Sequence, residues 1–122
     1  MSSEVDVFLS DLKHIRKEEI GRLYSIISSE FEVLESEIKW NAPSFKLGGS
    51  NVITFRLFPE PVFQLILHLG AKKLPAPIKL KFEIVELNHR WADSTRCVIT
   101  INENFEWEPL KIAISDWLNR VG

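Results

Sequence analysis

Cysteine is almost absent from the sequence, since Cys97 is the single one in 122 residues. One cysteine excludes an intramolecular disulfide and excludes a zinc site built from several thiolates. Cys97 lies in the apolar run Cys97-Val98-Ile99, where a thiol is normally inert. We therefore expect Cys97 to be a small core residue.

Long apolar segments are also missing. The longest strongly apolar run, residues 62–69, is interrupted by Gln64 and His68 and is far shorter than the roughly 20 residues of a membrane-spanning helix. The N-terminal residues show neither the basic region nor the apolar core of an export signal. We therefore expect a cytoplasmic protein with no membrane partner. The length favours a single domain over residues 1–122.

The sequence lacks the common catalytic and metal-binding motifs. It contains no G-x-S-x-G elbow, no P-loop and no G-x-G-x-x-G. His14, His68 and His89 do not have the spacing that places two metal ligands on one helix face. A net charge of −2 without a Lys/Arg-rich run argues against a nucleic-acid partner. These absences predict a protein that is not an enzyme.

Charge is unevenly distributed along the chain. Residues 1–37 contain nine acids and four bases, residues 38–91 contain three and eight, and residues 92–122 contain five and three. An acidic first third suits a cation or a basic partner, and a basic middle suits an anion. The alternative is that these charges only solvate exposed surfaces.

Apolar spacing predicts two N-terminal helices and one C-terminal helix. Val5, Phe8, Leu9 and Leu12 share one face of the first helix, which Ser2 or Ser3 can cap. A break at residues 13–16 precedes a second helix that ends near Ser29. The last helix starts near Glu106, and its apolar spacing puts Trp117 in the core.

The middle of the chain predicts an antiparallel sheet. Gly48-Gly49-Ser50 is typical of a tight hairpin turn, and strands are expected at residues 52–58, 62–68 and 96–101, with a further candidate at 81–87. Prolines in residues 70–79 indicate a loop, and residues 88–94 form a polar and aromatic irregular run. The prediction is an α+β fold with an antiparallel sheet of about five strands, covered on one face by the helices.

The chain is organised around the segment Ile38-Lys39-Trp40-Asn41-Ala42-Pro43-Ser44-Phe45-Lys46. It joins rigid apolar side chains to amide, hydroxyl and ammonium groups, a mixture that suits the wall of a cleft. Pro43 restricts the backbone of the preceding Ala42 to extended conformations, so we expect an ordered irregular run. The alternative is a structural corner between helix and sheet.

The cations of the middle segment suggest a cleft that binds a small polar or anionic ligand or a partner segment. Arg56, His68, Lys72 and Arg96 flank predicted strands, and Trp40 and Trp91 can border the same cleft. The full set of candidate ligand-binding residues is Lys39, Trp40, Asn41, Phe45, Arg56, His68, Lys72, Trp91 and Arg96. In the alternative interpretation, Arg56 and Arg96 pair with helix carboxylates and His68 is hydrogen-bonded near the core. A weaker hypothesis is a hydrolase or transferase that uses His68 with Asp93.

Several segments, in this order, resemble the YdhG-like family of bacterial domains of unknown function. The matching segments are Val5-Asp6-x-Phe8-Leu9, Ile38 to Phe45, Thr54-Phe55-Arg56-Leu57, Gln64 to Lys72, Trp91 to Arg96, and Ile114-x-x-Trp117-Leu118. The resemblance covers almost the whole chain. It implies an α+β fold and a stand-alone cytosolic protein with no assigned enzyme activity. We expect a monomer or a homodimer, and the sequence does not distinguish the two.

Some members of that family are described as frataxin-like intracellular iron chaperones, so the resemblance makes iron a possible cargo. Frataxin-type binding uses an acidic ridge on the first helix, and carboxylate oxygens are suitable ligands for iron. The candidate residues in this chain are Glu4, Asp6, Asp11, Glu18 and Glu19. No frataxin motif matches them residue by residue, and a solvated helix face would have the same composition.

Overall fold

The computed structural model describes residues 3–69, 87–93 and 95–121. The helices are α1 (Ser3–Asp11), α2 (Lys17–Glu30) and α3 (Trp107–Val121). The strands are β1 (Glu35–Lys39), β2 (Ala42–Leu47), β3 (Ser50–Arg56), β4 (Gln64–Leu67), β5 (His89–Asp93) and β6 (Arg96–Thr100). The predicted helices, the break between the first two and the predicted α+β class are confirmed.

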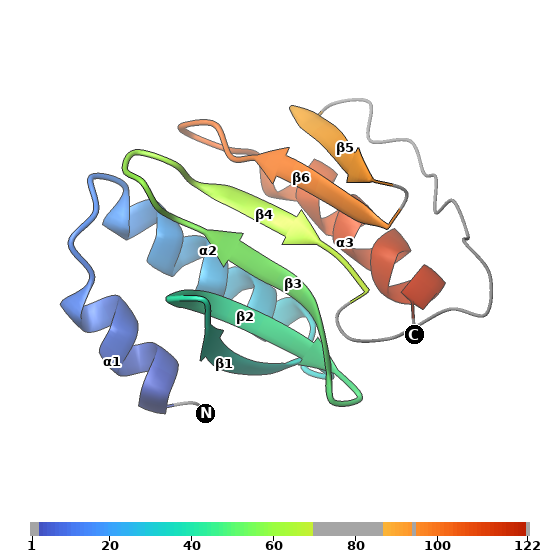
Figure 1. The fold of residues 1–122 in the computed structure, drawn as a ribbon, viewed down its shortest axis with the longest axis horizontal. Helices are drawn as coiled ribbons and strands as arrows, with labels where there is room; N and C mark the ends of the chain where they lie inside the picture. The colour runs from blue at the N-terminus through green and yellow to red at the C-terminus, as the bar shows by residue number, and fades with distance from the viewer. Residues whose placement is uncertain (1–2, 70–86, 94, 122) are drawn as a thin grey trace.

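The six strands form one antiparallel sheet in the order β1-β2-β3-β4-β6-β5. Figure 1 shows α2 and α3 lying side by side against one face of this sheet. The expected number of about five strands was therefore too low. None of the described helices has both the length and the apolarity needed to cross a membrane.

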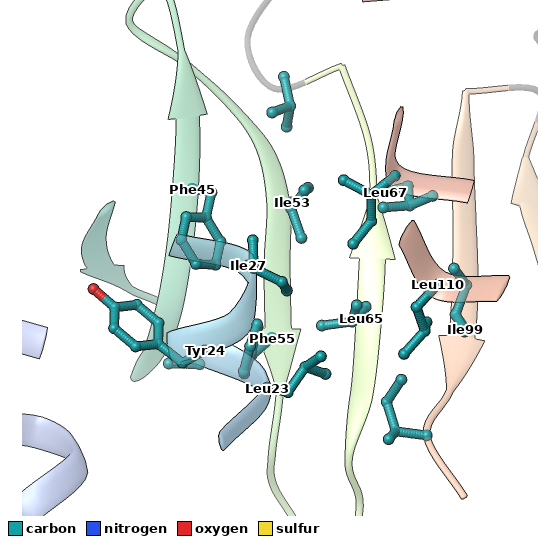
Figure 2. Close-up of a cluster of buried hydrophobic side chains, with 14 of the residues drawn as sticks. Leu23, Tyr24, Ile27, Phe45, Ile53, Phe55, Leu65, Leu67, Ile99 and Leu110 are labelled. Atoms are coloured by element: carbon teal, nitrogen blue, oxygen red, sulfur yellow. The ribbon is translucent and has the colours of Figure 1, made fainter. Parts of the chain in front are cut away.

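The hydrophobic core lies between the sheet and the helices. Alternate residues of the central strands point into it, and Figure 2 shows them meeting side chains of α2 and α3. The strands contribute Phe45, Ile53, Phe55, Leu65, Leu67 and Ile99, and the helices contribute Leu23, Tyr24, Ile27 and Leu110. Cys97 and Trp117 are fully buried in the same core, as the sequence predicted.

Trp117 also connects α3 to the sheet through a hydrogen bond. Its indole Nε1–H donates to the backbone oxygen of His68 over 3.1 Å. A buried indole N–H without a partner would be costly. This bond therefore fixes the end of β4 against the last helix.

His14 fastens the α1–α2 connection to the connection between β3 and β4. Its Nε2–H donates to the backbone oxygens of Leu57 at 2.9 Å and Val62 at 3.0 Å. Its Nδ1 accepts the backbone N–H of Arg16 at 3.0 Å. Because His14 is buried, both ring nitrogens serve as structural partners for backbone groups.

Two segments expected to be irregular are regular strands. The segment 38–46 lies in a hairpin, because β1 and β2 pair from Glu35↔Lys46 to Lys39↔Ala42 around a two-residue turn. Residues 89–93 form β5, which pairs with β6. The edge strands β1 and β5 are rich in polar residues and lack the apolar alternation by which the sequence identifies strands. Strand β2 lies inside the sheet, but its Pro43 argues against a strand in the sequence. The expected loop 70–79 and most of the expected strand 81–87 lie outside the described residues.

The two-residue turn between β1 and β2 is made by Trp40 and Asn41. Both have positive φ, 53° and 59°, as in the type I′ turns that match the twist of a hairpin. Asparagine tolerates this left-handed conformation, whereas a side chain such as tryptophan pays about 1–2 kcal/mol for it. The sequence did not indicate this turn, because Asn-Gly is its usual signature and Trp-Asn is not.

Candidate functional site

A buried polar network crosses the sheet on the face opposite the helices. Thr54 Oγ1 shares hydrogen bonds with Ser44 Oγ at 2.8 Å and with His68 Nε2 at 2.9 Å. Asn51 Nδ2 donates to Ser44 Oγ and to Glu37 Oε2, both at 2.9 Å. The network therefore links β1, β2, β3 and the end of β4. Hydrogen bonds satisfy its buried groups, as burial of polar side chains requires.

His68 lies at one end of this network and is 6% exposed. Burial lowers its pKa to about 4, and the charges of Lys39 and Arg96 add to the shift. The imidazole is therefore neutral at pH 7. Both cations thus lie close enough to His68 to disfavour its protonated form, although the chain as a whole has a net charge of −2.

Trp40 stands beside His68 at the tip of the β1–β2 hairpin. Its ring centroid is 6.3 Å from that of His68, with 49° between the planes. Lys39 Nζ lies 5.0 Å from the centre of the Trp40 ring, within the range of a cation–π contact. Despite these contacts Trp40 remains 72% exposed. A large aromatic ring is thus held at the surface next to two polar groups.

Lys39 makes no salt bridge within residues 3–69, 87–93 and 95–121, although its charge lies close enough to Glu37 to help lower the pKa of that carboxyl group. Lys46 pairs with Glu37 at 3.6 Å and Arg96 pairs with Asp93 at 3.0 Å. The Nζ of Lys39 instead donates to the neutral amide oxygen of Asn51 at 3.1 Å.

Arg96 reaches the same region from the neighbouring strand. Leu67 and Cys97 are partners in the β4–β6 register, which puts Arg96 opposite His68. We call the group formed by Lys39, Trp40, His68 and Arg96 the Trp40–His68 site.

Other candidate residues lie elsewhere. Phe45 is 1% exposed and stacks on Tyr24 in the core, with ring centroids 5.4 Å apart. Trp91 faces the helices, 6.2 Å from the ring of Trp117. Arg56 is exposed and donates to Gln64, at the opposite end of β4 from His68. Asn41 is the exposed second residue of the turn. Lys72 lies outside the described residues.

The sequence missed three residues that support the site: Glu37, Asn51 and Thr54. Their side chains occupy the face opposite the core, where polar residues normally face water. The alternation of polar and apolar residues along the strands therefore gave no reason to place these three residues in the site. A β-bulge between Phe45 and Lys46 shifts the register, and it brings Asn51 next to Ser44. Strand spacing alone gives no sign of that shift.

The alternative interpretation of the cations is correct for His68 and wrong for the arginines. His68 is hydrogen-bonded and buried, as that interpretation required. Arg56, however, bonds to a glutamine of the neighbouring strand, and Arg96 pairs with a carboxylate of β5. Neither arginine takes a helix carboxylate as its partner.

The proposed catalytic groups are engaged in other contacts. The carboxylate of Asp93 accepts hydrogen bonds from Thr95 and Arg96, and these bonds lower its pKa. The Nε2 of His68 is occupied by Thr54. Burial raises the pKa of the Cys97 thiol to about 11, which makes its thiolate scarce at neutral pH.

The N-terminal acids do not form a metal site in the described residues, where no three Asp, Glu, His or Cys side chains gather closely enough to hold an ion. Glu19 has structural partners. It pairs with Arg16 at 2.8 Å and accepts the backbone N–H of Asn104, and the hydrogen bond from Arg16 lowers its pKa. The candidates Glu4, Asp6, Asp11, Glu18 and Glu19 therefore do not fit an iron site.

One known structure resembles this fold over nearly its whole length. It is the crystal structure of YdhG from Bacillus subtilis, a protein of the family called domain of unknown function 1801. The two structures superpose with a TM-score of 0.66 over 96% of this chain and 90% of YdhG, at 17% sequence identity. This chain has the YdhG fold. No protein-family model matches the sequence, and no curated protein matches it.

The YdhG fold is the one that the sequence resemblance implied. Its two N-terminal helices, six-stranded antiparallel sheet and C-terminal helix account for all the elements described above. At 17% identity the similarity concerns the fold, and function has to be argued from the site.

The strain at Trp40 leads to a testable prediction. Replacing Trp40-Asn41 by Asn-Gly (Trp40→Asn with Asn41→Gly) is expected to raise the free energy of unfolding by about 1 kcal/mol. Trp40 is mostly exposed, so little apolar burial is lost. Urea unfolding measures the change, and Asn41→Gly alone is the control. A less stable double variant would show that the contacts of Trp40 outweigh its strain.

Proposed function

We propose that this chain is a non-enzymatic binding protein, and that the Trp40–His68 site binds a small polar or anionic ligand. A partner segment with the same groups is the other possible occupant. The observation that carries the proposal is Trp40 itself, a strained and 72% exposed tryptophan next to an ammonium that makes no salt bridge within the described residues. Strained residues persist where the surroundings hold them, and they cluster at functional sites.

The supporting network favours binding over catalysis. A general base must reach the proton that it abstracts, yet His68 is buried and its Nε2 is hydrogen-bonded to Thr54. The same hydrogen bonds make the site rigid. Asn51 positions Lys39, and the paired strands of the hairpin position Trp40. A preorganised site loses less entropy when it binds a ligand.

The alternative function, a frataxin-like iron chaperone, lacks a supporting observation in the described residues. The acids that such a function would use are dispersed over α1 and α2. Among them, Glu19 is already engaged by Arg16 and Asn104.

The proposal can be tested by titrating the isotope-labelled protein with acetate and with inorganic phosphate. Amide and indole chemical shifts should change at residues 39, 40, 68 and 96. Lys39→Ala should remove these changes because it deletes the ammonium group. Arg56→Ala is the matched control, because Arg56 is an exposed cation at the far end of β4. Equal responses in wild type and Lys39→Ala would refute the proposed site.

A further inference from the structure

We propose that the ligand of the Trp40–His68 site is an aromatic monocarboxylate, a flat ring with a single negative charge. This inference rests on the proposed function and narrows the ligand to one chemical class. It depends on two observations: the exposed ring of Trp40 and the neighbouring ammonium of Lys39, which makes no salt bridge within the described residues.

The exposed ring provides the platform for a flat ligand. Trp40 is held by the hairpin turn, by Lys39 at 5.0 Å and by the neighbouring ring of His68. A tryptophan that is fixed before binding loses little rotational freedom when a ligand stacks on it. Aromatic pairs in offset geometry gain affinity beyond the area that they bury. A saturated ring of similar size does not have this advantage.

The charges around the platform favour one anion. Of the three cations Lys39, Lys46 and Arg96, Lys46 pairs with Glu37 and Arg96 pairs with Asp93. Lys39 makes no salt bridge within the described residues. His68 adds no charge at neutral pH, since its pKa is about 4. The ammonium of Lys39 therefore favours a ligand with one negative charge over a cationic ligand.

The position of Lys39 limits the distance between ring and charge in the ligand. Its Nζ donates to Asn51 and lies over the Trp40 ring, 5.0 Å from the ring centroid, so one small ligand can reach both the ring and the ammonium. A carboxylate that reaches this ammonium must be attached to the ring directly or through a short linker. Benzoate is the simplest compound that meets this condition.

Benzoate, cyclohexanecarboxylate and acetate form a matched set of probes, because all three have one carboxylate and two have rings of similar size. Chemical-shift titration should give benzoate about five-fold tighter binding than cyclohexanecarboxylate, with acetate weaker than both. Benzylamine, a cationic aromatic compound, should not shift the site. Trp40→Phe should retain the preference for benzoate, and Trp40→Leu should abolish it while keeping an apolar side chain.

The outcomes separate this inference from the proposed function. If cyclohexanecarboxylate binds as tightly as benzoate, the aromatic specificity is refuted and the anion site remains. If none of the three acids shifts residues 39, 40 and 68, the aromatic monocarboxylate is refuted, and if inorganic phosphate also fails to shift them, the proposed site is refuted as well. Both Trp40 variants change a mostly exposed side chain, and their unchanged amide spectra should verify that they are folded.

Discussion

Acidification from pH 6.5 to pH 4 should reduce the free energy of unfolding by about 3 kcal/mol through His68 alone. Its pKa is about 4 in the folded protein against 6.5 for the free side chain, and one pKa unit corresponds to about 1.4 kcal/mol. Between these values the unfolded chain binds a proton that the folded chain excludes. The contribution of His68 to the free energy of unfolding is therefore fully present above pH 6.5 and is lost as the pH falls toward 4.

The measurement is urea unfolding at a series of pH values, for wild type and for His68→Gln. Glutamine keeps a polar group but does not titrate. Carboxyl groups such as Glu19, Glu37 and Asp93, whose pKa values are lowered, also lose stabilisation in acid, and they do so in both proteins. The difference between the two curves thus isolates His68. Parallel curves would mean that His68 is not neutral and buried as described.

His14→Ala should lower the free energy of unfolding by about 3 kcal/mol. The ring of His14 satisfies the backbone oxygens of Leu57 and Val62 and the N–H of Arg16. Each buried polar group left without a partner costs about 1–3 kcal/mol. The variant removes all three bonds, and water entering the vacated space offsets part of the loss.

The control for this prediction is His89→Ala. His89 is only partly buried, and its Nδ1 contacts the backbone oxygen of Leu87 two residues away. Its replacement should cost less than about 1 kcal/mol. Chemical denaturation of the three proteins gives the comparison. A similar decrease in the free energy of unfolding for both variants would show that the hydrogen bonds of His14 contribute no more to stability than those of His89.

The sequence predicted the parts of the fold that apolar periodicity determines. Val5, Leu23 and Trp117 each belong to the apolar stripe of a different helix, and all three are buried in the structure. A surface helix buries one apolar stripe against the core, so the spacing of its apolar residues identifies the buried side. The hairpin at Gly48 and Gly49 was also predicted correctly, since both glycines have positive φ. Edge strands β1 and β5 were missed, because polar residues predominate in them and pairing with a neighbour stabilises them.

The candidate site was predicted in part. Lys39, Trp40, His68 and Arg96 do lie together, whereas Phe45 faces the helices. The sequence could not show that Phe45 lies on the opposite face of the sheet from the other candidates, because the face on which a strand residue lies depends on the register of that strand. A bulge next to Phe45 changes that register, and shifting a strand by one residue moves its side chains to the other face.

The hydrogen bond from Trp117 to the backbone oxygen of His68 provides a probe, on the helix side of the sheet, for changes at His68. The side chain of His68 lies on the face opposite the helices, while its backbone oxygen contacts the indole of Trp117. The chemical shift of an indole N–H depends on its hydrogen bond, and NMR separates this signal from those of the other three tryptophans. The indole N–H signal of Trp117 should therefore register a change in the position of His68.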